Sequence, residues 1–445
     1  MQSTIAYKDQ LWERQSDAEA FLLKNIEVFL KDCPDLSKFS KELLDCTAVR
    51  LRDLVDHISF SDVEVESDLH KLGWKPFGEG IFENESGFFP AFIRSTSAEL
   101  WFRVEDVANF LNVRGIHSPI SGVEFGRCRK AIIFVAGSLK VGVIERNGYR
   151  DYGVPFVTND EIKSAKLHLQ VFRSRRRQFD TIEQGLAHTE RLIDQSVLEI
   201  GPDWSCDLWL RAEREYWMRN CAAGRLQKIR QDAIGIGWAN IDHHTYDGSR
   251  KHFRHTIRIL KKLGYQLREM LYAGELAGWG SQVLWQPAIR STVFADVDLA
   301  PNELTIDFAH EVLTNLSKHR RAGLLSELLG ESILEAGLNH VAGLFSQSHF
   351  RDQAGKSGIE MMKPFTDWPH LYQELTTGDW AAVDPNRVDI LLASGHIEID
   401  EAEKLSLQGS IVTHFENIER NDGFKGFNRD GIDGVLKKLD PRAYL

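Results

Sequence analysis

One short pattern occurs three times in this chain and constrains its fold more than any other feature. Each time an apolar residue precedes an Asp or Asn and then a His, and the first two cases continue with a hydroxyl-bearing and an aromatic residue. The strings are Val55-Asp56-His57-Ile58-Ser59-Phe60, Ile241-Asp242-His243-His244-Thr245-Tyr246 and Leu338-Asn339-His340-Val341-Ala342-Gly343. Each can open a β-strand that carries its His on one face. Such a recurrence predicts structural modules that stack on their copies to close a core.

The second string is followed by the elements of a complete module. Apolar residues at helical spacing begin near Phe253 and end at Gly264. Three strand-like segments follow, over residues 266–272, 281–286 and 292–297. The order is strand, helix and three strands (βαβββ), and we therefore predict an α+β fold built from paired βαβββ modules.

The pattern divides the chain into four expected segments. Residues 1–54 show helical periodicity and form a helical lead-in. Residues 55–158 contain short β-rich runs and are expected to be a degenerate pair of βαβββ-type modules. Residues 159–232 return to helical spacing as a connector. Residues 233–445 form the second module pair, with a helical insertion at about 359–408.

Composition excludes several classes of function. The net charge is −11 and the pI is about 5.8, so nucleic acid is a poor partner. The dense basic run over 173–177 is expected to be a solvated helix face. Five cysteines without a CxxC pair argue against a disulfide framework and a thiolate zinc site. With no leader pattern and no run of ~20 apolar residues, we expect a cytoplasmic protein that does not bind membranes.

The repeat also carries a resemblance to a known superfamily. A βαβββ repeat with a His on its opening strand resembles the vicinal oxygen chelate superfamily, whose paired modules close a cup-shaped mixed sheet around a divalent metal. Over roughly residues 235–435 the chain is similar to the 2-oxoadipate dioxygenase/decarboxylase (hydroxyglutarate synthase) family. The matching strings are Trp238 to Tyr246, Leu263 to Glu269, Phe294 to Leu299, Gly337 to Val341 and Gly409 to Arg420.

The resemblance implies a site of two His and one carboxylate for iron(II), Fe(2+), with another divalent metal as the alternative. The ligands it implies are His243, His340 and Glu416. Such a triad holds a metal on one face and leaves positions for a chelating substrate and dioxygen. His244 and Glu419 stay open as alternatives, because adjacent strand residues point to opposite faces.

One departure from the family pattern puts the substrate in question. The family has, four residues after the first His, an Arg that grips the substrate carboxylate, whereas this chain has Asp247. Arg250, Arg254 and Arg268 are candidates to replace it. We also expect Tyr246 and Gln282 to take part in the site.

The N-terminal half is expected to lack a site of its own. His57 aligns with His243 and Glu145 closes a later strand, but the segment 99–104 has no His to complete a triad.

These features predict a non-haem iron(II)-dependent oxygenase that acts on a small chelating organic acid, such as a 2-oxo acid, with dioxygen. The alternatives are a metal-dependent isomerase or lyase of the glyoxalase type and a metal-free protein that binds a small ligand. The sequence leaves the oligomeric state open.

Overall fold

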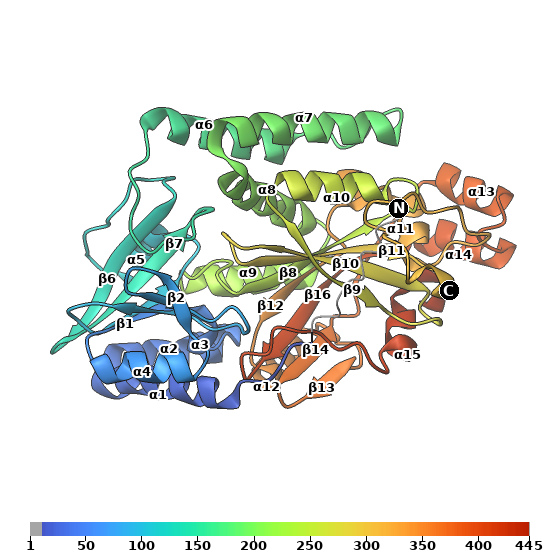
Figure 1. Ribbon diagram of the computed structural model, residues 1–445. Coiled ribbons are helices and arrows are strands. Elements are labelled where there is room, and N and C mark those ends of the chain that lie inside the picture. Colours follow the sequence, from blue (N-terminus) through green and yellow to red (C-terminus); the bar gives the residue numbers. More distant parts are fainter. Residues whose placement is uncertain (1–10, 445) are drawn as a thin grey trace, which may run out of the picture.

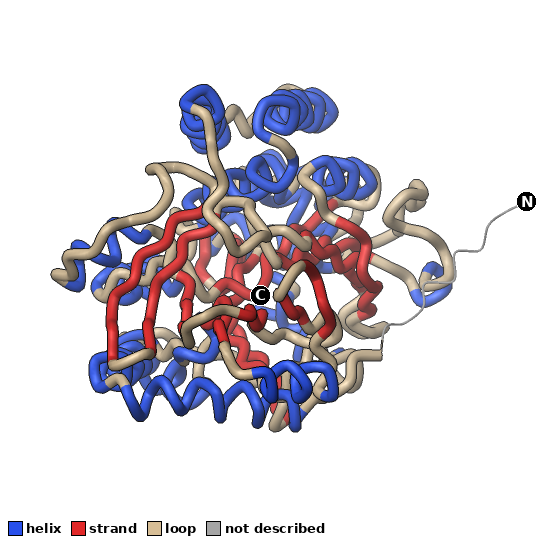
Figure 2. The backbone as a smooth tube through the Cα atoms, turned by 60° about the vertical axis from the view of Figure 1, so that its left-hand side comes forward, coloured by secondary structure: helices blue, strands red, loops and turns tan. Residues whose placement is uncertain are grey.

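A computed structural model of the protein describes residues 11–444, so the first ten residues of the expected lead-in lie outside the described part. The chain forms two curved mixed sheets, one from each half, which lie side by side with helices packed around them (Figure 1). In the view of Figure 2, helices lie above and below the strands. The fold is α+β, as predicted.

The N-terminal sheet has seven strands in the order β2-β3-β4-β1-β5-β7-β6. The lead-in is helical as expected, and α1 carries buried apolar residues at helical spacing. The elements of this half are α1 (Ser16–Asp32), α2 (Pro34–Thr47), α3 (Leu51–Leu54), β1 (Val55–Phe60), α4 (Val63–Lys71), β2 (Lys75–Gly78), β3 (Ile81–Glu83), β4 (Ala91–Arg94), β5 (Glu99–Arg103), α5 (Val107–Arg114), β6 (Cys128–Ala136) and β7 (Leu139–Arg146).

Four helices connect the two sheets, and α6 and α7 lie along the top of the molecule in Figure 1. They are α6 (Asn159–Ser174), α7 (Ile182–Ile200), α8 (Pro202–Trp217) and α9 (Ala222–Ala233). The expected solvated helix face over 173–177 holds for Arg173, which is exposed in the last turn of α6, and is wrong for the rest of the run, because α6 ends at Ser174. Arg175 is buried and pairs with the buried Glu213 (Nη2 to Oε1, 3.0 Å), which neutralises its charge inside the protein.

The C-terminal sheet contains the predicted pair of βαβββ modules. Its order is β13-β14-β16-β12-β8-β11-β10-β9, with β15 also paired to β16. In each module the first strand pairs in parallel with the last, and β8 pairs antiparallel with β12 where the modules meet. The elements are β8 (Ile241–Gly248), α10 (Phe253–Lys262), β9 (Gln266–Tyr272), β10 (Trp279–Gln286), β11 (Ser291–Asp298), β12 (His340–Leu344), α12 (Gln347–Lys356), β13 (Thr366–Trp368), β14 (Leu371–Leu375), β15 (Asp379–Ala381), α13 (Pro385–Ala393), α14 (Ile399–Gln408) and β16 (Ser410–Arg420).

The expected helical insertion at about 359–408 is only partly helical. Its first half supplies β13, β14 and β15, and only α13 and α14 are helices. All five residues of β14 are buried between β13 and β16, so that strand has no exposed face to give the sequence a period of two.

Shorter elements complete the C-terminal half. They are η1 (Pro301–Glu303), α11 (Arg321–Leu329), η2 (Ser332–Ala336), α15 (Asp433–Leu436), η3 (Lys437–Leu439) and η4 (Pro441–Tyr444). Among residues 11–444, no helix combines the length and the apolar character that a membrane span needs.

Candidate metal centre

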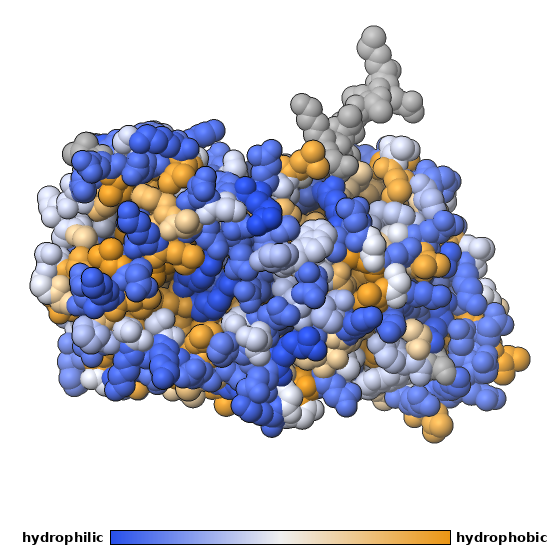
Figure 3. Space-filling model, turned by 90° about the horizontal axis from the view of Figure 1, so that it is seen from below, coloured by the Kyte–Doolittle hydropathy of each residue, from blue (hydrophilic) through white to orange (hydrophobic). Residues whose placement is uncertain are grey.

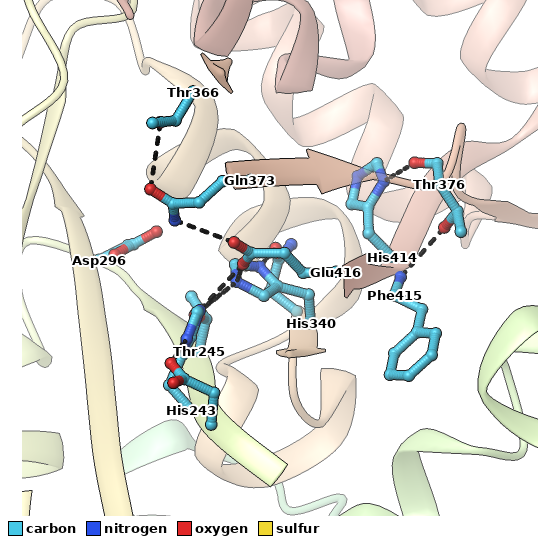
Figure 4. Close-up of polar contacts among 12 residues, drawn as sticks. His243, Thr245, Asp296, His340, Thr366, Gln373, Thr376, His414, Phe415 and Glu416 are labelled. Atoms are coloured by element: carbon cyan, nitrogen blue, oxygen red, sulfur yellow. Dashed lines mark hydrogen bonds and ion pairs between the residues drawn. The ribbon is translucent and has the colours of Figure 1, made fainter. Parts of the chain in front are cut away.

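Three neighbouring strands bring His243, His340 and Glu416 to one face of the C-terminal sheet. β8, β12 and β16 are adjacent, and Ala342 of β12 lies opposite both His243 and Glu416. The small Ala342 side chain leaves space between these two residues. His340, two residues before Ala342, points to the same side. The three side chains therefore surround one small space (Figure 4).

The three donor atoms have the spacing that a metal site requires. His243 Nε2 lies 3.3 Å from His340 Nε2 and 3.0 Å from Glu416 Oε2, and His340 Nε2 lies 3.2 Å from the same oxygen. Neighbouring ligands of an octahedral ion with bonds of ~2.1 Å lie ~3 Å apart. Within the described part of the chain, this is the one group of three His, Cys, Asp or Glu residues placed to hold a metal ion. The donor set fits a divalent metal bound on one face.

Each of the three side chains is oriented by a contact of its other polar atom. His243 Nδ1 lies 2.8 Å from Asp242 Oδ1, and Asp242 in turn accepts from Arg420 Nε at 2.7 Å. Gln373 Nε2 donates to Glu416 Oε1 at 3.0 Å, which leaves Oε2 for a metal. His340 Nδ1 lies 3.3 Å from the side-chain oxygen of the preceding Asn. Contacts of this kind fix ring tautomers and orientations around metals.

The charges of the triad depend on one another. Burial favours the neutral ring of His243, but Glu416 and Asp242 outweigh it and raise the His243 pKa to about 9. Burial likewise opposes ionisation of Glu416, whereas His243 and His340 hold its pKa at about 2. The ionised Glu416 therefore stabilises the protonated ring of His243. A bound divalent cation takes the place of that proton.

The triad lies at one side of a small cavity of about 60 Å³. Its apolar lining comes from both modules and from the segment after β16: Leu271, Trp279, Phe294, Phe365, Leu375, Phe427, Ile432, Leu436 and Leu439. The Phe427 ring stands perpendicular to the His243 ring with centroids 5.5 Å apart. A space of this size holds a few water molecules or the reactive end of a small acid.

Arg321 is the cation of this cavity, and the sequence analysis missed it. It is 1% exposed and lies over the Trp279 ring at 4.2 Å. Its Nη2 is 2.9 Å from Asp247 Oδ1 and 2.5 Å from Asp296 Oδ2. Asp247 stands four residues after His243, at the position where the resembled family has its Arg. In this chain the cation is Arg321 of α11, which pairs with Asp247. Burial raises the pKa of Asp247 to about 7, against the attraction of Arg321.

The alternatives for the ligands lie elsewhere. His244 is on the opposite face of β8, where its Nε2 is 3.2 Å from Nη1 of Arg214 on α8. Glu419 accepts from Arg50 Nη1 at 2.9 Å and from a backbone amide at the start of α12.

The other predicted site residues do not line this cavity. Tyr246 shares the outer face of β8 with His244, and its hydroxyl accepts from Trp209 Nε1 at 3.0 Å. Arg250 pairs with Glu303, Arg268 pairs with Glu269 and Arg254 is exposed on α10. The Gln282 amide donates to the backbone oxygen of Glu269 at 3.0 Å.

The N-terminal half repeats the framework of the site without its ligands. His57 Nδ1 contacts Asp56 at 2.7 Å and Arg146 holds Asp56, as Asp242 and Arg420 do for His243. In the C-terminal sheet, His243, Ala342 and Glu416 lie opposite one another on three adjacent strands. The corresponding residues of the N-terminal sheet are His57, Trp101 and Gly142. The Trp101 ring fills the space, and a Cβ on Gly142 would lie 2.3 Å from it.

A lysine stands beside His57 in this N-terminal arrangement. Lys130 Nζ lies 3.4 Å from His57 Nε2 and 4.3 Å above the Trp101 ring. An ammonium group thus takes the place next to Nε2 that a metal would need. Glu145, the other candidate of this half, accepts instead from Arg129 Nη1 at 3.1 Å.

Comparisons with known proteins give similarity in structure only. No family model matches the chain, and no curated protein matches it in sequence. A variant of 4-hydroxymandelate synthase from Streptomyces coelicolor is 10% identical, with 88% of this chain and 99% of that chain covered and a TM-score of 0.30. Methylmalonyl-CoA epimerase from Mycobacterium tuberculosis is 10% identical, with 41% and 89% covered and a TM-score of 0.23.

A further similar structure is a fusion of a xylose isomerase-like TIM barrel with 4-hydroxyphenylpyruvate dioxygenase. It is 12% identical, with 89% of this chain and 53% of that chain covered and a TM-score of 0.24. These neighbours are members of the vicinal oxygen chelate fold. Because their identities and TM-scores are low, they carry no weight for the chemistry of this chain.

Proposed function

We propose that the protein is a non-haem iron(II)-dependent oxygenase that acts on a small 2-oxo acid. The observation that carries the proposal is the set of three donors on one face, His243 Nε2, His340 Nε2 and Glu416 Oε2, at mutual distances of 3.0 to 3.3 Å. Two imidazoles and one carboxylate leave half of an octahedral coordination sphere open. Non-haem iron oxygenases use that arrangement.

His243, His340 and Glu416 would hold the iron(II), which when bound would supply Lewis-acid and oxygen chemistry to a chelating substrate. The chain's own residues orient the substrate. Arg321 Nε has no hydrogen-bond partner in the described structure and is available to a carboxylate of the substrate. The apolar lining excludes bulk water from the open side of the triad.

Metal analysis of purified variants tests the proposal. We expect wild type to hold about one iron per chain, and His243→Ala, His340→Ala and Glu416→Gln each to lose most of it. Glu419→Gln, which alters a Glu on the same strand outside the cavity, is the matched control and keeps its iron. Full iron content in all three triad variants would reject the site.

Oxygen consumption identifies the reaction class. With a series of 2-oxo acids, iron-loaded protein should consume dioxygen and release carbon dioxide, and Glu416→Gln should do neither. Turnover without oxygen would instead support the isomerase or lyase alternative. A protein that binds 2-oxo acids without stoichiometric metal would support the binding-protein alternative.

A further inference from the structure

A second, larger cavity of about 420 Å³ lies in the cleft between the two halves. The N-terminal half contributes Arg103 of β5 and the segment 83–90, and the C-terminal half contributes Trp285, Arg290 and Lys425. None of the described residues lines both this cleft and the cavity of the triad. Hydrophilic side chains predominate across the middle of the face seen in Figure 3, whereas hydrophobic ones are more frequent over its left-hand part.

Lys425 is a buried cation of the cleft, and among the described residues it forms no ion pair with a carboxylate. It is 8% exposed, and in the described part of the chain the one hydrogen bond of its ammonium group runs to the backbone oxygen of Glu85 at 3.2 Å. The group lies over the Trp285 ring, 4.5 Å from its centroid. Burial, with Arg268 and Arg290 nearby, lowers the pKa of Lys425 to about 8. An ammonium group in this setting is destabilising unless an anion joins it.

Arg103 is under-satisfied in the same cleft. Its one hydrogen bond within residues 11–444, from Nη2 to the backbone oxygen of Asp53, is 3.4 Å long, and its buried Nε has no hydrogen-bond partner there. The carboxylates of Asp56 and Asp53 attract Arg103 through space but form no hydrogen bond with its guanidinium group among the described residues, because Asp56 accepts from Arg146 and Asp53 accepts from Arg50 at 2.7 and 2.8 Å.

Arg290 is a third cation of the cleft, and its charge acts on both Arg103 and Lys425. It ends the turn between β10 and β11 with a φ of +51°, a left-handed conformation that is unfavourable for Arg. Its Nη2 donates to Glu83 at 3.0 Å and to the Tyr152 hydroxyl at 2.7 Å. Glu83 also accepts from Arg150 at 2.6 Å, so one carboxylate serves two guanidinium groups.

The cleft therefore has more positive charge than its own acids neutralise. Four carboxyl groups line it against six cationic side chains. Of the two acids not yet described, Asp242 is bound by Arg420, and the exposed Glu85 attracts Lys425 only from a distance. Beside the cations stand two aromatic rings, Phe88 and Trp285, with centroids 6.0 Å apart. The cations suit an anionic head group, and the rings suit a flat apolar group attached to it.

We propose that this cleft is a second ligand site, which takes a small organic anion with its carboxylate or phosphate among Arg103, Arg290 and Lys425 and its flat apolar part against Trp285 and Phe88. This inference goes beyond the proposed oxygenase function and does not depend on it. Asp242 and Arg420 line the cleft and also orient His243, so an anion bound here lies two side chains away from the triad.

Calorimetric titration of the full-length protein tests the site. The probes are benzoate, phenyl phosphate and inorganic phosphate. Benzoate and phenyl phosphate distinguish the two head groups, and inorganic phosphate measures the contribution of the rings. We expect one of the two aromatic probes to bind one site per chain. Lys425→Met and Arg103→Met should each weaken binding at least ten-fold, while Lys425→Arg retains most of it.

Two controls make the result decisive. Glu416→Gln must bind the same probe unchanged, because the triad lies outside the cleft. Lys425→Met should also raise the melting temperature of the free protein, because it removes a buried charge without a carboxylate partner, whereas a Lys that only holds the structure together would lower it when replaced. Absence of binding by all three probes at millimolar concentration, equal binding by Lys425→Met and Arg103→Met, or loss of binding in Glu416→Gln overturns the proposal.

Discussion

At the scale of single residues, the repeated Asp-His pair explains how the two halves share a framework and differ in chemistry. In both halves an Arg on the last strand holds the Asp, and the Asp contacts Nδ1 of the His. Nδ1 then carries the proton and Nε2 is left for a cation. Only in the C-terminal half do a second His and a Glu surround that nitrogen.

Asp242 is a positioning residue, and its replacement should weaken metal binding. Asp242→Asn keeps the shape but removes the charge that orients His243, and we expect iron affinity to fall ~10- to 100-fold. The measurement is competition with a chelator of known iron affinity. Asp56→Asn is the matched control, since it breaks the same contact in the half without the triad and should leave iron affinity unchanged. Equal affinity in Asp242→Asn and wild type would contradict the assigned role.

His57 should make the stability of the protein depend on pH. Burial lowers its pKa from 6.5 to about 4, with Lys130 and Arg146 adding to the shift and Asp56 opposing it. Between these values the unfolded chain binds a proton that the folded chain does not, so stability is lost as the pH falls from about 6.5 to 4. The loss from this one residue is at most about 3 kcal/mol.

Urea unfolding at several pH values measures this effect. His57→Gln should flatten the dependence of the free energy of unfolding between pH 6.5 and 4, whereas replacement of the exposed His70 by Gln should leave it as in wild type. The same slope in His57→Gln and wild type would show that other groups carry the loss.

At the scale of elements, the sequence predicted the strands that have a distinct pattern. β1 and β9 match their predicted bounds. The repeated string covers β1 from end to end, and the turn at Gly264 marks the start of β9. The helix α4 and the strand β2 were missed. The helix has few apolar residues, and all four residues of β2 are exposed. The repeat aligned the two His residues of the triad, and Glu416 came from the family resemblance. Arg321 lies between the modules and pairs with Asp247 only through tertiary packing.

The segment after β16 should control which acids enter the cavity of the triad. Phe427 packs against Phe294 with centroids 4.6 Å apart and limits the cavity to about 60 Å³. If the substrate is a 2-oxo acid, Phe427→Ala should raise kcat/KM for longer chains relative to short ones by roughly ten-fold, about the effect of one methylene in a fitted pocket.

A matched variant separates selectivity from general loosening of this segment. Phe424 precedes Phe427 by three residues and packs against Leu371 and Ile418, in a cluster that Phe427 also touches, but Phe424 does not line the cavity of the triad. Phe424→Ala should cost stability and leave the preference for chain length as in wild type. The same preference in Phe427→Ala and wild type would mean that another element limits the substrate.

At the scale of the whole molecule, α8 joins the two halves. Trp209 donates to Tyr246 of β8, and Trp217 Nε1 donates to Thr413 of β16 at 2.6 Å. From the same helix Arg211 Nη2 reaches Asn147, next to β7, at 2.9 Å. One buried hydrophobic cluster runs through both sheets and this helix. The fold therefore presents the triad on one sheet of a continuous core, and we expect the two halves to unfold together.

Hydrogen exchange of the full-length protein checks this expectation. Trp209 is fully buried, so Trp209→Ala should lower the free energy of unfolding by about 3–5 kcal/mol. Because the two sheets share one core, the slowest-exchanging amides of β1 and of β8 should lose protection by the same amount. Trp380→Ala, at a Trp that is 41% exposed, should change neither. Lost protection in β8 with β1 unchanged would mean that the halves are separate cooperative units, and that the N-terminal sheet does not support the strands that carry the triad.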